Sequence, residues 1–190
     1  METKNQKIRF SVLAGIVLLA VFSRLIPHPP NFTPLIAIAL FGGAYFSKKS
    51  YAFMIPLIAM LISDILIMRF IYAHISTIPE YFISSATISV YISFALIVLI
   101  GFLLHNRVKV LNVVFASLAG SILFFIVVNF AVWAGGSYNL YPKNMTGLIE
   151  CYVAAIPFFK NTLISALVYS GVLFGSFELA KFRFSVLTKA

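Results

Sequence analysis

Residues 110–134 read VLNVVFASLAGSILFFIVVNFAVWA, a run that contains no Asp, Glu, Lys or Arg. A helix needs about 20 consecutive, mostly apolar residues to cross the hydrocarbon core of a bilayer. This stretch therefore predicts a transmembrane helix, which we place near residues 108–134.

The composition of the whole chain agrees with this interpretation. Hydrophobic residues make up 62% of the 190 residues and charged residues 10%, whereas soluble domains carry about 25% charged residues. A soluble fold of this size has no interior large enough for so much apolar surface. No polar stretch is long enough to fold separately, so we expect residues 1–190 to form a single transmembrane domain.

Apolar runs of comparable length recur along the chain and predict six transmembrane helices. The first run is long enough to span and ends in a proline cluster, which favours a retained helix over a cleaved signal peptide. The second run is short, and we expect it either to tilt little or to be shielded by its neighbours. The predicted helices lie near residues 8–26, 34–46, 51–71, 82–104, 108–134 and 157–180. A short additional helix that starts near Thr146, before the last of these, is an alternative that the sequence leaves open.

The positive charges predict the orientation. With a cytoplasmic N-terminus, ten of the fourteen Lys and Arg residues fall on the inner side, in agreement with the positive-inside rule and an even number of spans. The fold class is therefore an all-α polytopic protein of the inner (cytoplasmic) membrane, with both termini in the cytoplasm. Because these cations lie in short segments between apolar runs, the net charge of +9 does not indicate nucleic-acid binding.

Small residues recur at the spacing that lets helices pack closely in lipid. Each pair predicts either packing inside the bundle or docking to a partner subunit, and the first predicted helix is the best candidate for docking. The pairs are Ser11 with Gly15, Ala116 with Gly120, and Gly171 with Gly175.

Polar residues inside apolar runs are costly in lipid, so their depth is informative. Asp64 lies about 20 Å along its predicted helix from the cytoplasmic start, and Arg24 closes the outer end of the first helix. Two pairs lie one helical turn apart near the outer surface: Asn129 with Trp133, and Asn161 with Ser165. We expect the cytoplasmic halves to hold almost nothing comparable, so that polar groups converge on the outer end.

The predicted outer segments, 27–33, 72–81 and 135–156, are longer than the inner turns. Long segments rich in aromatic and amide groups above polar helix ends are typical of a capped ligand site. Three simpler interpretations stay open. Asp64 pairs with Arg24 or Lys160 to hold helices together, Trp133 and the loop tyrosines form an interfacial aromatic belt, and Cys151, the single cysteine, is a packing residue.

Motifs of catalysis and metal binding are missing from the sequence. There is no His-Glu-x-x-His, no Gly-x-Ser-x-Gly and no Gly-x-x-x-x-Gly-Lys. No His pair has metal-ligand spacing on one helix, and nothing indicates a cofactor. An enzyme built around Asp64 or Glu150 is an alternative without a recognisable nucleophile and base.

Several motifs together resemble a bacterial family of small integral membrane proteins of unknown function. They begin with Arg24-Leu-Ile-Pro-His-Pro-Pro-Asn-Phe-Thr-Pro and Ala39-Leu-Phe-Gly-Gly-Ala-Tyr-Phe. They continue with Asn129-Phe-Ala-Val-Trp, Tyr141-Pro-Lys-Asn-Met-Thr-Gly-Leu and Cys151-Tyr-Val-Ala-Ala-Ile-Pro-Phe-Phe-Lys-Asn-Thr. The resemblance covers nearly the whole chain.

In size, topology and distribution of polarity, the chain is also similar to S components of energy-coupling-factor (ECF) vitamin transporters. That similarity is architectural. It implies an outward-facing ligand pocket and an ATPase-energised transporter partner that docks on the first helix.

The leading hypothesis is a substrate-capture subunit for uptake of a small polar or vitamin-like molecule. Arg24 would contact an anionic group, Asp64 would orient Arg24 or meet a cationic group, Asn129 and Asn161 would donate hydrogen bonds, and aromatic residues would form a stacking wall. The candidate site comprises Arg24, His28, Asn31, Asp64, Asn129, Trp133, Tyr138, Tyr141, Glu150, Lys160 and Asn161.

Two rival hypotheses predict different structures. An intramembrane enzyme acting on a lipid or isoprenoid would use Asp64, Glu150 and His28 in acid–base roles, in a pocket open sideways to lipid. A structural or assembly subunit would have Arg24 and Asp64 paired and closed off, with no cavity beneath residues 135–156.

Overall fold

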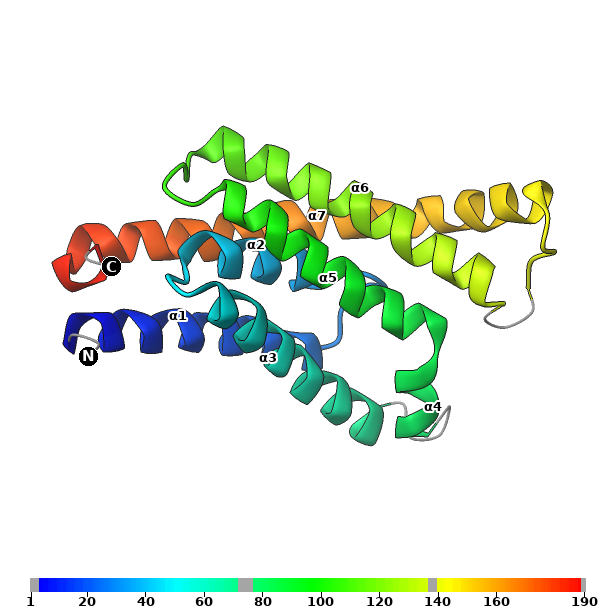
Figure 1. Ribbon diagram of the computed structural model, residues 1–190, viewed down its shortest axis with the longest axis horizontal. Coiled ribbons are helices and arrows are strands. Elements are labelled where there is room, and N and C mark those ends of the chain that lie inside the picture. The colour runs from blue at the N-terminus through cyan, green and yellow to red at the C-terminus, as the bar shows by residue number, and fades with distance from the viewer. Residues whose placement is uncertain (1–3, 72–76, 137–139, 189–190) are drawn as a thin grey trace.

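The computed structural model describes residues 4–71, 77–136 and 140–188, and all regular structure in these residues is helical. The helices are labelled in Figure 1. They are α1 (Lys4–Phe22), η1 (Ser23–Leu25), α2 (Leu35–Tyr45), α3 (Lys49–Phe70), α4 (Ile78–Ile83), α5 (Ser85–Leu103), α6 (Val110–Gly135), α7 (Met145–Arg183) and η3 (Ser185–Leu187).

The helices run alternately in opposite directions, and both ends of the described chain lie at one end of the bundle (Figure 1). We call this end the terminal end and the opposite one the distal end. Helices α1, α3 and α6 run toward the distal end, and α2, α5 and α7 return. The basic residues that begin α3, precede α6 and end α7 therefore gather at the terminal end.

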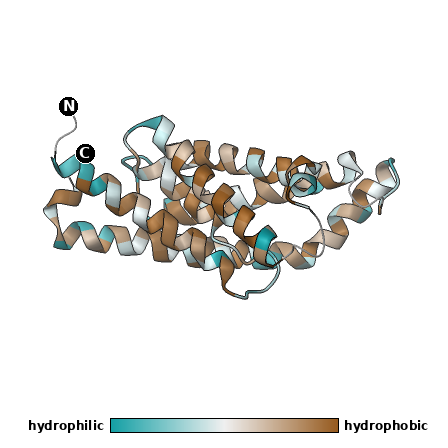
Figure 2. Ribbon diagram, turned by 90° about the horizontal axis from the view of Figure 1, so that it is seen from below, coloured by the Kyte–Doolittle hydropathy of each residue, from teal (hydrophilic) through white to brown (hydrophobic). Residues whose placement is uncertain are grey.

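Within the described residues, five helices are long and apolar enough to cross a membrane: α1 with η1, α3, α5, α6 and α7. Their surfaces are covered by aliphatic and aromatic side chains, and hydrophilic residues gather at helix ends and connections (Figure 2). These features identify a multi-pass membrane protein. Helix α2 has eleven residues, a length of about 16 Å, and is too short to cross a hydrocarbon core of about 30 Å alone.

Helix α2 occupies the centre of the bundle. Every one of its residues is buried, and α5, α3, α7, α1 and α6 all contact it. A helix that is apolar on all sides is stable only where all sides are covered. The structure thus shows the second of the two arrangements expected for this run, in which neighbouring helices shield it.

The closest backbone approach in this core joins α2 to α5. A Cβ atom added to Gly43 would lie 2.8 Å from Gly101 Cα, and one added to Gly101 would lie 2.6 Å from the Leu40 carbonyl oxygen. Only glycine allows this approach, and α2 and α5 make the most extensive helix contact of the bundle as described. The sequence analysis did not select this glycine pair.

The final helix is longer than predicted: the expected start near Pro157 is wrong, and the short helix considered from near Thr146 is the first part of the same helix. Helix α7 begins at Met145, where the Asn144 side chain caps it by accepting a hydrogen bond of 2.9 Å from the Gly147 N–H. Pro157 lies inside the helix. Proline is tolerated in transmembrane helices because neighbouring groups and small local adjustments satisfy the freed carbonyl. Most of the predicted 135–156 loop is therefore helical.

The predicted helix near 82–104 also differs in its first turn. Ser84 ends the short helix α4 and caps α5, its side chain accepting a hydrogen bond of 3.1 Å from the Thr87 N–H. The polypeptide bends at this residue because its backbone is extended, with φ −66° and ψ 140°. The bend turns α4 away from the axis of α5 and places it beside the distal ends of α3 and α5 (Figure 1).

The three pairs of small residues behave differently from one another. A Cβ atom on Gly120 would meet Ile36 of α2 at 3.1 Å, so that glycine packs inside the bundle. Added Cβ atoms on Gly15, Gly171 and Gly175 would meet nothing within 4 Å. Intramolecular packing therefore explains only the Ala116 and Gly120 pair.

The α2–α5 contact makes a stability prediction. We expect Gly43→Ala and Gly101→Ala each to lower the free energy of unfolding by about 1–3 kcal/mol, since the new methyl group must displace backbone. Thermal unfolding in detergent measures this change. Gly15→Ala is the matched control and should be neutral or slightly stabilising; equal stability of all three variants would contradict the packing account.

Candidate functional site

A buried ion pair joins the distal end of α1 to α3. Arg24, in η1, places Nη1 2.7 Å from Asp64 Oδ1, and the Asp64 side chain is 2% exposed. Arg24 also donates to the Ser63 hydroxyl, and the Tyr91 hydroxyl donates to Asp64 Oδ2 at 2.9 Å. Both carboxylate oxygens are therefore engaged, and the charge of Arg24 is neutralised inside the protein. The pairing is one of the alternatives that the sequence left open.

Tyr81, from α4, lies beside this pair. Burial and the nearby Asp64 carboxylate raise the pKa of the Tyr81 hydroxyl to about 12, so the hydroxyl keeps its proton at neutral pH. A capping box positions α4: the Thr77 N–H donates to Glu80 Oε2 at 2.9 Å and the Glu80 N–H to the Thr77 hydroxyl. The hydrogen bonds from Thr77 also lower the pKa of the exposed Glu80 carboxyl.

Two adjoining cavities share Arg24, Asn31, Thr33 and Tyr81 in their walls. The deeper one, which we call the inner chamber, has a volume of about 160 Å³. The wider vestibule has a volume of about 480 Å³. The remaining inner-chamber residues are Leu35, Ile36, Val90, Phe124, Thr162 and Ser165; those of the vestibule are Leu25, Ile26, Pro27, His28, Pro30, Ile67 and Ile71.

The inner chamber exists because α2 is short. Helix α2 begins at Leu35, part of the way across the bundle, and Leu35 and Ile36 form one wall of the chamber. The first N–H groups of a helix have no partner within the helix. The beginning of α2 therefore adds backbone hydrogen-bond donors to this region.

The inner chamber is polar but carries no net charge. Arg24 is neutralised by Asp64, and the other polar side chains in its wall are neutral. The Thr162 hydroxyl donates to the Phe158 carbonyl at 3.3 Å, and the Ser165 hydroxyl to the Thr162 carbonyl at 2.9 Å. Since these hydroxyl protons are engaged, the two oxygen atoms are left as acceptors for a bound molecule.

Residues 26–34 cover the chamber, and α7 holds them in place. The Asn161 side chain donates to the Pro30 carbonyl at 2.9 Å, and the Phe32 and Tyr169 rings lie 5.9 Å apart. The turn between Pro30 and Phe32 contains a residue in the left-handed backbone conformation. This residue is Asn31, with φ 61°, and asparagine adopts this conformation more readily than most residues.

The structure brings together part of the predicted site. Arg24, His28 and Asn31 line the cavities, Asp64 neutralises Arg24, and Asn161 anchors the cover.

The other predicted residues lie elsewhere. The Asn129 side chain donates to the carbonyl of Phe125 on its own helix at 2.7 Å, and Trp133 Nε1 donates to the Pro142 carbonyl at 3.0 Å. Tyr141 is half-buried outside both cavities, Glu150 and Lys160 are exposed, and Tyr138 lies outside the described residues.

The expected cap formed by residues 135–156 is therefore wrong, for a structural reason. In this region α6 and α7 pack against each other: the Tyr152 hydroxyl donates to the Ile126 carbonyl at 2.7 Å, and the Phe125 and Phe159 rings lie 4.8 Å apart. The α6–α7 hairpin extends beyond the other helices at the distal end (Figure 1). The cavities are lined instead by the much shorter segment 26–34.

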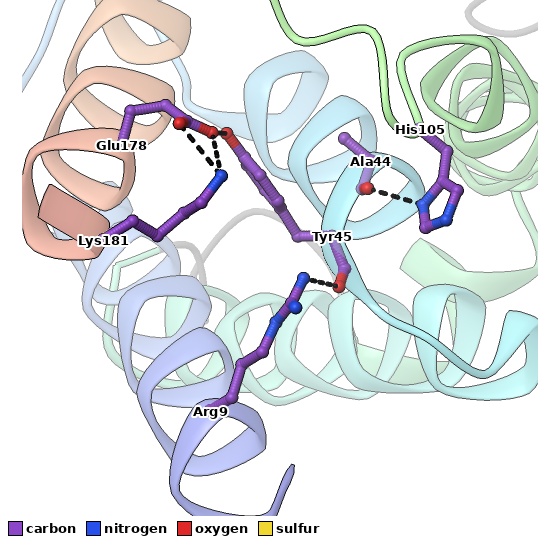
Figure 3. A network of polar contacts seen from close by, with 6 residues as sticks. All are labelled: Arg9, Ala44, Tyr45, His105, Glu178 and Lys181. Atoms are coloured by element: carbon purple, nitrogen blue, oxygen red, sulfur yellow. Dashed lines mark hydrogen bonds and ion pairs between the residues drawn. The ribbon is translucent and has the colours of Figure 1, made fainter. Parts of the chain in front are cut away.

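A second polar cluster, which the sequence did not predict, lies at the terminal end (Figure 3). The Tyr45 hydroxyl donates to Glu178 Oε1 at 2.5 Å, and Lys181 Nζ lies 3.0 Å from the same oxygen. Arg9 Nη2 donates to the Tyr45 carbonyl at 3.3 Å, and His105 Nδ1 lies 3.0 Å from the Ala44 carbonyl. The contacts of Arg9 and His105 satisfy backbone carbonyls at the end of α2. The half of the bundle that holds the termini is therefore not nearly apolar, and the expectation that polar groups converge on the other half alone is wrong.

Several residues of these sites had no distinctive signal in the sequence. Tyr81 and Thr33 reach the inner chamber only because of the path that the backbone of their segments takes in the folded protein. Thr162 is a single hydroxyl-bearing residue within an apolar helix. Glu178 was detectable as an acid three residues before Lys181 in an otherwise basic terminal segment. Across the described residues, no three His, Cys, Asp or Glu side chains are grouped closely enough to hold a metal ion.

Comparison with known proteins identifies the family. Residues 4–187 match the model of a family of unknown function (DUF6580), and the chain belongs to that family. No curated protein and no solved structure matches the chain. The family match confirms the predicted resemblance to a family without an assigned function, whereas the similarity to ECF S components gains no support from it.

The buried ion pair makes a stability prediction. Asp64→Leu should lower the free energy of unfolding by about 3–5 kcal/mol, because it leaves the Arg24 guanidinium buried and unpaired. The double variant Arg24→Met with Asp64→Leu should recover most of that loss, as measured by thermal unfolding in detergent. If the double variant were as unstable as Asp64→Leu alone, the two side chains would not be energetically coupled.

Proposed function

We propose that this member of the DUF6580 family is a solute-binding membrane subunit that captures a small polar molecule in the inner chamber. The observation that carries the proposal is a chamber within the membrane-spanning bundle whose wall combines Arg24, Tyr81, Thr162 and Ser165. Polar groups around a cavity in an apolar bundle are costly unless they serve packing or binding. Here they surround open space.

The charge balance favours a neutral ligand. The sequence hypothesis gave Arg24 the role of anion contact, but Asp64 already neutralises its charge at 2.7 Å. A neutral molecule with several hydroxyl or amide groups suits the walls better: the start of α2 would donate hydrogen bonds, and the Thr162 and Ser165 oxygens would accept them. With about 160 Å³ in the chamber, a larger ligand would extend into the vestibule.

The direction of capture follows from the positive-inside rule. Basic residues gather at the terminal end, so we assign that end to the cytoplasm and the cavities to the outer face of the inner membrane. In this orientation the chain crosses the membrane six times, and one of the six crossings consists of α2 together with residues 26–34.

A chain of this size without a nucleotide-binding motif would depend on an ATPase-energised transporter partner for uptake. Helix α1 would give this partner a docking face, which contains Gly15 and the exposed residues Ser11, Leu18 and Leu19.

The two rival functions receive less support. An enzyme using Asp64, Glu150 and His28 would need these groups near one another, but Glu150 is exposed on α7 and Asp64 is fully engaged. A purely structural subunit accounts for the Arg24–Asp64 pair and for the packing of α6 against α7 where a cavity beneath residues 135–156 was expected. It also predicts a pair that is closed off, whereas Arg24 lines both cavities. It gives no reason for a polar cavity beside the pair.

A thermal-shift screen of neutral polar metabolites against the purified protein tests the proposal. At a concentration 100 times its Kd, a specific ligand stabilises the folded state by about 2.7 kcal/mol. Thr33→Val and Thr162→Val should each weaken binding while leaving the unliganded melting temperature nearly unchanged, because each replaces only a hydroxyl group.

Asn129→Ala provides the matched control, since this side chain bonds within its own helix, and should leave binding intact. A screen without any stabilising compound, or equal loss of binding in Asn129→Ala, would count against the proposal.

A further inference from the structure

A third cavity lies between α6 and α7 in the terminal half of the bundle, and the proposed function does not use it. This groove has a volume of about 320 Å³. Its walls are largely aliphatic and aromatic, with Val113 and Val114 on α6 and Leu167 and Phe174 on α7. The residues of each helix recur at three- and four-residue spacing, so each contributes a single face.

Two glycines keep the groove open. Gly171 and Gly175 line it, and a Cβ atom added to either would meet no other atom within 4 Å. At the deep end of the groove the two helices come together, where the Ser117 hydroxyl donates to the Ser170 hydroxyl at 2.9 Å. This hydrogen bond joins α6 to α7 at the end of the groove away from Lys109.

The length of the groove matches one leaflet. On α7 it extends from Leu167 to Glu178, a rise of about 16 Å at 1.5 Å per residue. Half of a hydrocarbon core of about 30 Å is close to this length. A partner transmembrane helix would need a groove along the whole core, whereas a single acyl chain fills one leaflet.

Positive charge lies at the mouth of the groove. Lys109 lines the mouth, exposed Arg107 precedes it, and neither has a carboxylate within ion-pair distance among the residues that the structure describes. Glu178 also lies at the mouth, but its carboxylate is engaged by the Tyr45 hydroxyl and by Lys181. The mouth therefore presents net positive charge at the level of lipid headgroups.

We propose that this groove is a binding site for an anionic phospholipid, with one acyl chain between α6 and α7 and the headgroup phosphate against Lys109 and Arg107. Basic pockets between transmembrane helices on the cytoplasmic side select anionic headgroups in this way. The site is independent of the inner chamber, and neither proposal depends on the other.

The test uses the full-length protein in bilayer nanodiscs of phosphatidylcholine and phosphatidylglycerol, re-extracted in mild detergent, with bound lipid counted by native mass spectrometry. The wild-type protein should retain phosphatidylglycerol in preference to phosphatidylcholine. The double variant Gly171→Leu with Gly175→Leu fills the groove and should lose the retained lipid. Lys109→Gln should keep a lipid but show about a fivefold weaker preference for phosphatidylglycerol.

Gly15→Leu is the matched control, because its new side chain also meets open space but lies on α1, outside the groove. It should retain lipid as the wild type does, and all variants should melt within a few degrees of the wild type. Unchanged lipid retention in the groove-filling variant, or equal loss in Gly15→Leu, would overturn the proposal. A wild-type dimer that the groove-filling variant converts to monomer would overturn it too, since a second copy would then occupy the groove.

Discussion

The structure depends on one constraint: its central helix, α2, is buried on every side and is shorter than the membrane is thick. A buried helix must find partners for the backbone groups at both of its ends. At the terminal end, Arg9 and His105 meet its last carbonyls. At the distal end the helix stops part of the way across the bundle, and the space beyond it becomes the inner chamber beneath residues 26–34.

This constraint also explains the placement of charge within the bundle. Each end of α2 is accompanied by a carboxylate and a cation from other helices: Asp64 with Arg24 at the distal end, and Glu178 with Lys181 at the terminal end. Tyrosine hydroxyls complete both clusters, Tyr91 for Asp64 and Tyr45 for Glu178. Because each carboxylate is matched by a cation, neither acid leaves an unpaired negative charge in the low dielectric of the bilayer.

The sequence predicted the membrane class and the six apolar runs because bilayer thickness dictates run length. It also identified Arg24 and Asp64, since charges inside such runs are rare. The prediction from the sequence failed where contacts between residues far apart in the chain determine the structure. Pro157 suggested a helix start, yet α7 continues through it, and the chamber lies under residues 26–34 because α6 and α7 pack together in a hairpin. The polar cluster of Glu178 was missed because its partner, Tyr45, is 133 residues away in the chain.

Because α2 stops short, we expect a water-accessible chamber on the face of the membrane opposite the termini. Labelling with a membrane-impermeant maleimide in oriented vesicles tests it most directly, using single cysteines in a Cys151→Ala background. Thr33→Cys and exposed Ser185→Cys should react from opposite faces of the membrane, and fully buried Ala39→Cys from neither. Labelling of Thr33→Cys and Ser185→Cys from the same face, or protection of Thr33→Cys from both faces, would contradict the account.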